Sequence, residues 1–280
     1  MKFRSIVFLF LSVSFILVSW KSNPLFPVKI DFCGEEVPLD VPDVHERLDR
    51  ELIINEYMHG STIMIIKRAY RFFPIIEPIL VKNNVPDDFK YLAVIESSLT
   101  NATSPSGAKG FWQFMPQTAK EKGMEITDGI DERYHLEKAT QAACEYLLKA
   151  KEKFGSWTLA AASYNGGMNG LQKAINQQLV SNYYDLLLTD ETFRYVFRIL
   201  ALKEIMKNPK QYGFELKETE LYKPLKVKKI EVDSSITDLA KFAKNQGVNY
   251  KELKLMNPWL RDVKLDNPNK KKYILDLPVK

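Results

Sequence analysis

One stretch, residues 86–116, constrains the fold most, because it joins a short helical pattern to a loop rich in glycine and aromatic residues. Pro86 suits the first turn of a helix, and Asp87 and Asp88 suit its positive end, so we expect a helix that ends near Ser98. Its apolar face would carry, at positions i, i+3, i+4 and i+7, Phe89, Leu92, Ala93 and Glu96. The stretch thus predicts one carboxylic acid on an apolar surface beside the loop.

Glu96 is the candidate for acid–base chemistry. On an apolar face near the C-terminus of a helix, both desolvation and the helix dipole disfavour a charged carboxylate. Such a glutamate tends to stay protonated and can act as a general acid. The alternative is a slightly rotated helix with a solvated Glu96, which is the commoner case because glutamate is rarely buried. Helical phase alone leaves both interpretations open.

Four stretches, in this order, resemble the four motifs of family 1 lytic transglycosylases. They are Ile95-Glu96-Ser97-Ser98, the loop Ser104-Pro105-x-Gly107-Ala108-x-Gly110-x-Trp112-Gln113-x-Met115-Pro116, Ala161-Ala162-Ser163-Tyr164-Asn165-Gly166-Gly167, and Glu191-Thr192-x-x-Tyr195-Val196. The loop, with Asp131-Glu132-Arg133 and a helical pattern after it, resembles in particular the membrane-bound lytic murein transglycosylase D type. The resemblance covers roughly residues 42 to 210, and four ordered motifs are more specific than any one of them.

The resemblance implies a reaction and a set of site residues. The reaction is cleavage of the β-1,4 bond between N-acetylmuramic acid and N-acetylglucosamine in peptidoglycan, with formation of a 1,6-anhydro ring. Glu96 would be the catalytic acid and base, and Tyr164 would hydrogen-bond near it and orient it. The residues implied to bind substrate are Ser97, Ser104, Gln113, Met115, Tyr164, Asn165 and Glu191. A cap for the last helix is an equal interpretation of Glu191. The resemblance implies no metal or cofactor, and a monomer.

Two other functions compete with this one. A goose-type lysozyme-like muramidase would use the same fold and the same glutamate with water as the nucleophile. It would need an acidic residue to position that water, and we expect none in the motifs, which counts against it. A non-catalytic wall-binding scaffold would keep only the fold. The presence of both Glu96 and Gln113 argues against the scaffold.

The N-terminal residues 1–22 have the pattern of an export signal: Lys2 and Arg4 precede an apolar run at residues 6–20. The run is shorter than the roughly twenty apolar residues that span a bilayer, so it favours a cleaved signal peptide. An uncleaved anchor, which would associate the chain with a membrane, is the alternative. Either places the protein in the periplasm or at an envelope membrane of a bacterium, and either argues against a nucleic acid partner. Residues 23–41 are expected to be a linker.

Residues 42–216 predict a mainly α, lysozyme-like catalytic domain. From Val41 to about Ile79 the pattern is helical, with Val44, Leu48, Leu52, Ile53 and Tyr57 recurring at intervals of three and four residues. The Met64-Ile65-Ile66 run and Phe72-Phe73 predict a second buried helix before Pro74 and Pro78. A third helix would bury Ala139, Ala142, Ala143, Tyr146, Leu147 and Ala150. Helices at residues 157–164 and from Thr192 to about Met206 would follow, the last with Phe193, Val196, Phe197, Leu200 and Ala201 as its apolar face. No strand pattern is evident before residue 225.

After a polar linker at residues 217–226, residues 227–280 predict a small α+β domain with the order strand, helix, helix, strand. The strands would lie at residues 230–232 and 273–278, and the helices at residues 236–243 and 250–258. This βααβ order and the Leu-x-x-Met-Asn-Pro sequence resemble a LysM module, a class that binds glycan chains. The usual Gly-Asp-Thr-Leu start is replaced here by Asp233-Ser234-Ser235-Ile236.

Charge is unevenly distributed along the chain. Residues 217–280 carry 15 Lys and Arg against 9 Asp and Glu, or +6, within a total of +5. A basic domain suits an anionic polymer such as peptidoglycan, although lysines spread over a small domain are also typical of a solvated surface. Only two cysteines occur, Cys33 and Cys144, so disulfides are not the scaffold. The two could form one disulfide or remain buried thiols.

Overall fold

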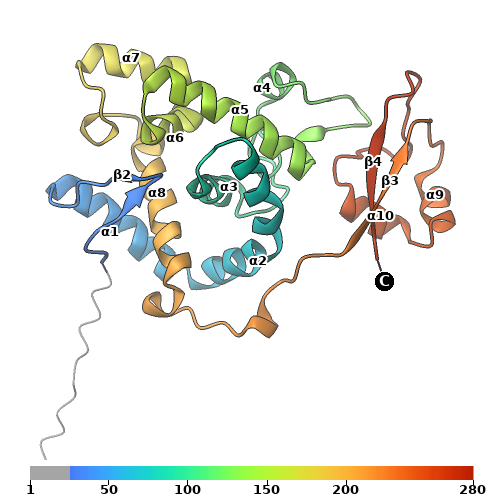
Figure 1. The fold of residues 1–280 in the computed structure, drawn as a ribbon, viewed down its shortest axis with the longest axis horizontal. Helices are drawn as coiled ribbons and strands as arrows, with labels where there is room; N and C mark the ends of the chain where they lie inside the picture. The colour runs from blue at the N-terminus through green and yellow to red at the C-terminus, as the bar shows by residue number, and fades with distance from the viewer. Residues whose placement is uncertain (1–25, 280) are drawn as a thin grey trace, which may run out of the picture.

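Helix α8 (Asp190–Lys207) lies at the centre of the larger domain, where it packs against α1 (Pro42–Tyr57), α3 (Lys90–Ser97) and α6 (Trp157–Gly166) (Figure 1). We expected it to begin at Thr192 with one apolar face. It begins two residues earlier, and residues 195–197 and 199–203 are all buried. Because helices pack on more than one side of it, its burial exceeds what a single hydrophobic stripe predicts.

The computed structural model describes residues 26–279. The expected signal peptide or anchor at residues 1–22 lies outside this part of the chain. Within it, no helix is long and apolar enough to cross a membrane. The architecture is mainly α with a small α+β C-terminal domain, which confirms the predicted fold class.

We expected the second helix to lie before Pro74 and Pro78. Instead, helix α2 (His59–Lys82) continues through both prolines. A proline inside a helix removes one backbone hydrogen bond and crowds the preceding turn. Both prolines lie on the exposed side of α2, where water can reach the carbonyls that lose their partners. On the opposite side Ile76 and Leu80 are fully buried and keep the helix against the core.

Helix α1 buries Val44, Leu48 and Leu52, as predicted. Two residues that we placed on the same face are exposed instead, Ile53 at 44% and Tyr57 at 86%. Both lie toward the end of the helix, and α2 begins two residues after Tyr57. The packed stripe of α1 is therefore shorter than the sequence pattern.

Further helices of this domain follow α3 in the sequence. The loop after α3 leads to α4 (Pro116–Glu121), α5 (Leu136–Phe154) packs on α2 and α6, and α7 (Met168–Gln178) follows α6 directly. The predicted small residues of α5 are buried, and Tyr146 is half-buried. Short 3-10 turns complete the domain: η1 (Asp87–Phe89), η2 (Glu132–Tyr134), η3 (Tyr183–Asp185) and η4 (Pro209–Tyr212). Another, η5 (Glu218–Glu220), lies in the segment that connects the two domains. Sequence patterns did not predict α4 or α7.

A small hairpin, β1 (Asp31–Phe32) and β2 (Glu35–Glu36), lies in the segment that we expected to be a linker. Ile30, Phe32 and Val37 are buried in the core of the helical domain. Lys203 of α8 is also buried and donates to the Asp31 carbonyl at 2.6 Å. The described part of residues 23–41 therefore packs as part of the helical domain. Cys33 in this hairpin and Cys144 on α5 are free thiols.

The C-terminal domain has the predicted βααβ order. Strands β3 (Val227–Val232) and β4 (Tyr273–Pro278) pair antiparallel, with Val227 opposite Pro278 and Val232 opposite Tyr273. Helices α9 (Leu239–Asn245) and α10 (Tyr250–Met256) lie between the strands in sequence, and α10 packs on β4. A chain segment running from the end of α8 past α2 connects the two domains (Figure 1).

Candidate active site

Glu96 lies one residue before the end of α3. The helix ends because Ser98 and Leu99 take left-handed backbone conformations, with φ of 52° and 55°. Every residue from Tyr91 to Ile95 is buried, so α3 is enclosed on all sides and not only on the apolar face that the sequence predicts. Glu96 itself is only partly exposed. The alternative of a solvated surface glutamate is therefore wrong.

Tyr195 of α8 provides the hydrogen-bonding partner of Glu96. Its hydroxyl donates directly to Glu96 Oε1, across 99 residues of sequence. Burial, and then the neighbouring Glu96 charge, raise the pKa of Tyr195 well above its ordinary value, so the phenol stays protonated and can only donate to the carboxylate. The fourth sequence motif contains Tyr195, but the sequence analysis did not single it out.

The surroundings of Glu96 adjust its acidity. Burial raises the pKa of Glu96 to about 7, against the hydrogen bond from Tyr195 and the positive charge of Arg198, which both lower it. The negative charge of Glu191 adds a small upward contribution. Arg198 also donates to the carbonyl of Ile95 at 3.1 Å, which places it at the C-terminal turn of α3. A carboxyl group with a pKa near neutrality can both give and take a proton in one reaction.

Tyr164 does not form the hydrogen bond that we expected. Its hydroxyl donates to the carbonyl of Trp112 at 2.8 Å, and its ring packs edge-on against Phe114 and Tyr146. The charge of Glu96 contributes to the raised pKa of Tyr164, after burial. Tyr164 therefore lies near Glu96 but supports the motif loop, and the orienting contact belongs to Tyr195.

The motif loop, residues 102–115, folds on itself through its own polar groups. Gln113 has a φ of 49°, and its amide donates to the carbonyls of Gly110 at 2.7 Å and Ala102 at 3.2 Å. The Ser104 hydroxyl accepts from the Ala108 amide at 2.9 Å. Trp112 is fully buried, and its indole donates to Thr140 of α5 at 2.8 Å. Ser104 and Gln113 thus shape the loop, and Trp112 attaches it to α5.

The other expected binding residues divide into enclosed and accessible ones. Ser97 is buried and donates to the Phe111 carbonyl at 2.9 Å, which joins α3 to the motif loop. Asn165 accepts from Thr192 at 2.7 Å, linking the ends of α6 and α8. Met115 is 42% exposed, and Glu191 is exposed in the first turn of α8. Only Met115 and Glu191 present their side chains openly.

A cavity of about 420 Å³ opens beside this centre. It is lined by Ile95 and Ser98 from the end of α3, by Glu191, Arg194 and Arg198 from α8, and by residues of α1 and α2. Arg194 is paired with the buried Glu51 at 2.7 Å. Over residues 26–279 no three His, Cys, Asp or Glu side chains gather where they could hold a metal ion.

Two family models match parts of this chain. The model of the transglycosylase SLT domain matches residues 73–186, and that of the soluble lytic transglycosylase C-terminal LysM-like domain matches residues 228–280. The chain is 30% identical over 235 residues to membrane-bound lytic murein transglycosylase D of Escherichia coli strain K12, covering 81% of this chain and 50% of that protein. The same values hold for the protein of that name from Escherichia coli O6:H1 strain CFT073.

A third relative is the putative tributyltin chloride resistance protein of Alteromonas sp. strain M-1. It is 30% identical over 122 residues, which are 43% of this chain and 59% of that protein. The chain spans only half the length of the two murein transglycosylases that it matches.

Proposed function

We propose that this chain, which carries a transglycosylase SLT domain followed by a LysM-like domain, is a lytic transglycosylase that cleaves peptidoglycan. The bond cleaved is the β-1,4 link between N-acetylmuramic acid and N-acetylglucosamine. The observation that supports this most is the enclosed Glu96, whose pKa of about 7 suits a group that must be an acid first and a base second.

In the first step Glu96 gives its proton to the glycosidic oxygen as the bond to the anomeric carbon breaks. The 2-acetamido oxygen of the substrate stabilises the anomeric carbon. Tyr195, which donates to the carboxylate, and Arg198, whose charge favours the ionised form, stabilise Glu96 after it has lost its proton.

In the second step the Glu96 carboxylate removes the proton of the muramic acid C6 hydroxyl. That oxygen attacks the anomeric carbon and closes the 1,6-anhydro ring, so no water is consumed and Glu96 regains its proton. One carboxyl group is sufficient for this route, whereas most glycosidases use two that flank the bond.

The exposed Met115 and Glu191 are proposed to contact the sugars directly. Ser104, Gln113 and Tyr164 are proposed to act by shaping the motif loop, and Ser97 and Asn165 by joining the elements around Glu96. The site works in a monomer on glycan strands of the bacterial envelope, with residues 1–22 as export signal or membrane anchor.

The test is mass spectrometry of the muropeptides that the protein releases from purified sacculi. Anhydro-ended products are expected. The Glu96→Gln variant should release about 10⁴-fold less or nothing, because Gln is nearly isosteric but cannot exchange a proton, and general acid–base catalysis is worth about 10² to 10⁴-fold. A matched control is Glu145→Gln on the exposed face of α5, which should be unchanged. Activity of Glu96→Gln within tenfold of the wild type would contradict the assignment.

Glu191 favours one alternative, a hydrolase that uses water. Its charge acts on Glu96, so it is an acidic residue near the reacting centre. If it positions water, the products of the wild type will carry reducing ends, and Glu191→Gln will abolish them. Anhydro ends that persist in Glu191→Gln would exclude the hydrolase.

A further inference from the structure

The C-terminal domain is not suspended on a free linker. Ile130 and Tyr134, which belong to the helical domain by sequence, are buried in the hydrophobic core of the C-terminal domain. Ile130 pairs with Leu260 as in a β-bridge. On either side of it, Asp131 donates its amide to Trp259 at 2.9 Å, and Gly129 accepts from Arg261 at 2.8 Å. Backbone hydrogen bonds therefore join the two domains.

Side chains extend this contact over residues 125–137. The indole of Trp259 stacks on His135, with centroids 5.8 Å apart, and the guanidinium of Arg261 lies 4.5 Å from the ring centroid of Tyr134. At the other edge Tyr273 donates to Glu125 at 3.0 Å. Lys271 also forms an ion pair with Glu125, and Lys229 forms one with Glu137 at 2.9 Å. The surface is mixed: aromatic at its centre and charged at its edge.

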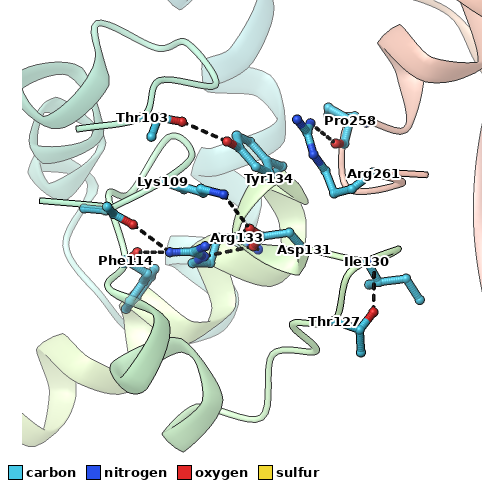
Figure 2. Close-up of polar contacts among 12 residues, drawn as sticks. Thr103, Lys109, Phe114, Thr127, Ile130, Asp131, Arg133, Tyr134, Pro258 and Arg261 are labelled. Carbon is cyan, nitrogen blue, oxygen red and sulfur yellow. Dashed lines mark hydrogen bonds and ion pairs between the residues drawn. The ribbon is translucent and has the colours of Figure 1, made fainter. Parts of the chain in front are cut away.

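The opposite side of the same segment holds the motif loop. Arg133 is 3% exposed and donates to the carbonyls of Gly107 at 2.9 Å and Phe114 at 3.2 Å. Asp131 holds this guanidinium in place with bonds of 2.7 and 2.8 Å. Figure 2 shows Lys109 and Phe114 of the loop on one side of Arg133 and Asp131, and Arg261 and Pro258 of the C-terminal domain on the other.

Two further contacts join the segment to the loop. Tyr134 shares a hydrogen bond of 2.9 Å with Thr103 (Figure 2), and the backbone at Gly110 runs so close that a Cβ there would lie 1.9 Å from the Arg133 carbonyl. Residues 130–134 are thus enclosed between the C-terminal domain and the motif loop. Neighbouring residues of this short turn contact the C-terminal domain on one side and the motif loop on the other. A displacement of the turn therefore moves the loop.

The connecting segment is also attached. Tyr222 donates its amide to the Lys67 carbonyl of α2 at 3.3 Å, and Arg71 of α2 donates to the Lys223 carbonyl at 3.0 Å. The expected linker at residues 217–226 therefore leads the chain along α2, which restricts where the C-terminal domain can lie.

We propose that the C-terminal domain is a brace for the catalytic site: by docking on residues 125–137 it fixes Asp131, Arg133 and Tyr134, and through them the motif loop. Ile130 and Leu260 are then positioning residues, which act on the reaction without touching substrate. The expected effect on turnover rests on the proposed function. The expected effect of docking on the order of the motif loop does not. The proposal predicts that docking raises turnover even of a small soluble substrate. Attachment of the protein to the insoluble wall cannot contribute to turnover of such a substrate.

The test variant is Ile130→Asp, which places a charge in the interface while leaving every residue of the motif loop and of the C-terminal domain intact. Small-angle scattering reports whether the domains separate. Amide hydrogen exchange at Lys109 and Gly110, whose N–H groups donate to Phe114 and Ala102, reports the order of the loop. Turnover is measured on a soluble muramyl tetrasaccharide with attached peptide.

We expect domain separation, faster exchange in residues 102–115, and a kcat lowered about tenfold to a hundredfold with a smaller change in KM, because misplacement of a site by about 1 Å costs up to 10²-fold. Ile130→Val should retain wild-type behaviour. Ile274→Asp is the matched control, since it makes the same kind of change at a site on β4 that is 43% exposed. Separated domains with unchanged loop exchange and unchanged kcat would overturn the proposal.

A second pair of variants covers the case in which Ile130→Asp fails to fold. Lys271→Glu reverses a charge that pairs with Glu125 of the helical domain, whereas Lys272→Glu reverses its neighbour, which pairs with Glu231 inside the C-terminal domain. Only the former should accelerate exchange in the loop, because Lys271 pairs with Glu125 and Glu132 of the helical domain. Equal exchange in the two variants would overturn the brace. If the wild type produces no anhydro ends, the proposed function is wrong. The amide hydrogen exchange of the motif loop still tests whether the C-terminal domain orders that loop.

Discussion

At the scale of single residues, the reactivity of Glu96 depends on what surrounds it more than on its place in the helix. Burial alone would hold the carboxyl protonated, and Tyr195 and Arg198 oppose this by favouring the charged form. The result is a pKa of about 7, between those of a surface glutamate and a fully desolvated one. The reaction needs both protonation states, so both influences are required.

This balance makes a prediction for Tyr195→Phe. The hydroxyl stabilises the ionised carboxylate, so its loss should raise the pKa of Glu96. Because the first step needs the protonated acid, kcat falls as pH rises through this pKa, and the falling limb should move to higher pH in the variant. The loss of one hydrogen bond to a charged group should also lower kcat about tenfold or more.

The matched control is Tyr164→Phe, which removes a hydroxyl that donates to Trp112 and not to Glu96. Its pH–rate profile should keep the limb of the wild type, although turnover falls if the motif loop loosens. If the falling limb of the pH–rate profile moves in Tyr164→Phe and stays in place in Tyr195→Phe, the roles of the two tyrosines are the reverse of those assigned here.

Gly110 and Gly107 of the motif loop supply a second prediction. Both have positive φ, 81° and 88°, so alanine at either position costs about 1 to 2 kcal/mol of backbone strain. At Gly107 a Cβ would meet nothing within 4 Å, whereas at Gly110 it would lie 1.9 Å from the Arg133 carbonyl. Gly110→Ala should therefore lower the free energy of unfolding by about 1 to 3 kcal/mol more than Gly107→Ala. Urea unfolding of both variants measures the difference, and equal losses would show that the close approach is relaxed in solution.

At the scale of elements, the N-terminal hairpin stabilises the helix that carries Tyr164. Glu35 of β2 accepts from the amides of Trp157 at 2.6 Å and Thr158 at 2.9 Å, at the N-terminus of α6. A carboxylate there satisfies donors that the helix leaves free and faces the positive end of its dipole. The segment at residues 31–36 thus fixes one end of α6, while the motif residues occupy the other.

Glu35→Gln should accordingly lower the free energy of unfolding by about 1 to 2 kcal/mol at neutral pH. Burial raises the pKa of Glu35, but hydrogen bonds from Thr158, Trp157 and Ser156 outweigh it and hold the pKa below its ordinary value of 4.5. Because the pKa of Glu35 is lower in the folded protein than in the unfolded chain, its stabilising contribution is fully present above pH 4.5. That contribution is lost as the pH falls through the lowered pKa of the folded protein.

The free energies of unfolding of the wild type and Glu35→Gln, measured by urea titration, should therefore differ less at about pH 3.5 than at about pH 7. Glu36→Gln is the control, because Glu36 only forms an exposed ion pair with Lys29 and should cost little at either pH. An equal loss in the two variants would mean that the contact with α6 does not stabilise the fold.

At the scale of the whole molecule, the two domains share one interface core and act on one loop. The net charge of +6 on residues 217–280 first indicates a wall-binding module. The structure adds that Lys229 and Lys271 of this module pair with acidic residues of the helical domain. Part of the basic character thus serves docking, and removal of the module would expose Ile130 and Tyr134, which are 3% and 5% exposed.

Sequence patterns alone predicted the longer helices, the order of the C-terminal elements and the reacting group. Helical periodicity identified α5, α6 and α8, strand and turn patterns identified the βααβ domain, and the first motif identified Glu96. These features are local, because spacing along the chain decides which face of an element is apolar. The continuation of α2 through Pro74 was missed, since a local rule for proline takes no account of the buried residues on the opposite face.

Which groups meet depends on tertiary packing. Tyr164 and Tyr195 both stand in recognisable motifs, yet the packing of α8 against α3 gives the contact with Glu96 to Tyr195. The docking of the C-terminal domain on Ile130 was equally invisible, because Ile130 lies in an irregular segment with no periodicity to read. Contacts between residues about a hundred positions apart depend on how whole elements pack, and no local pattern carries that information.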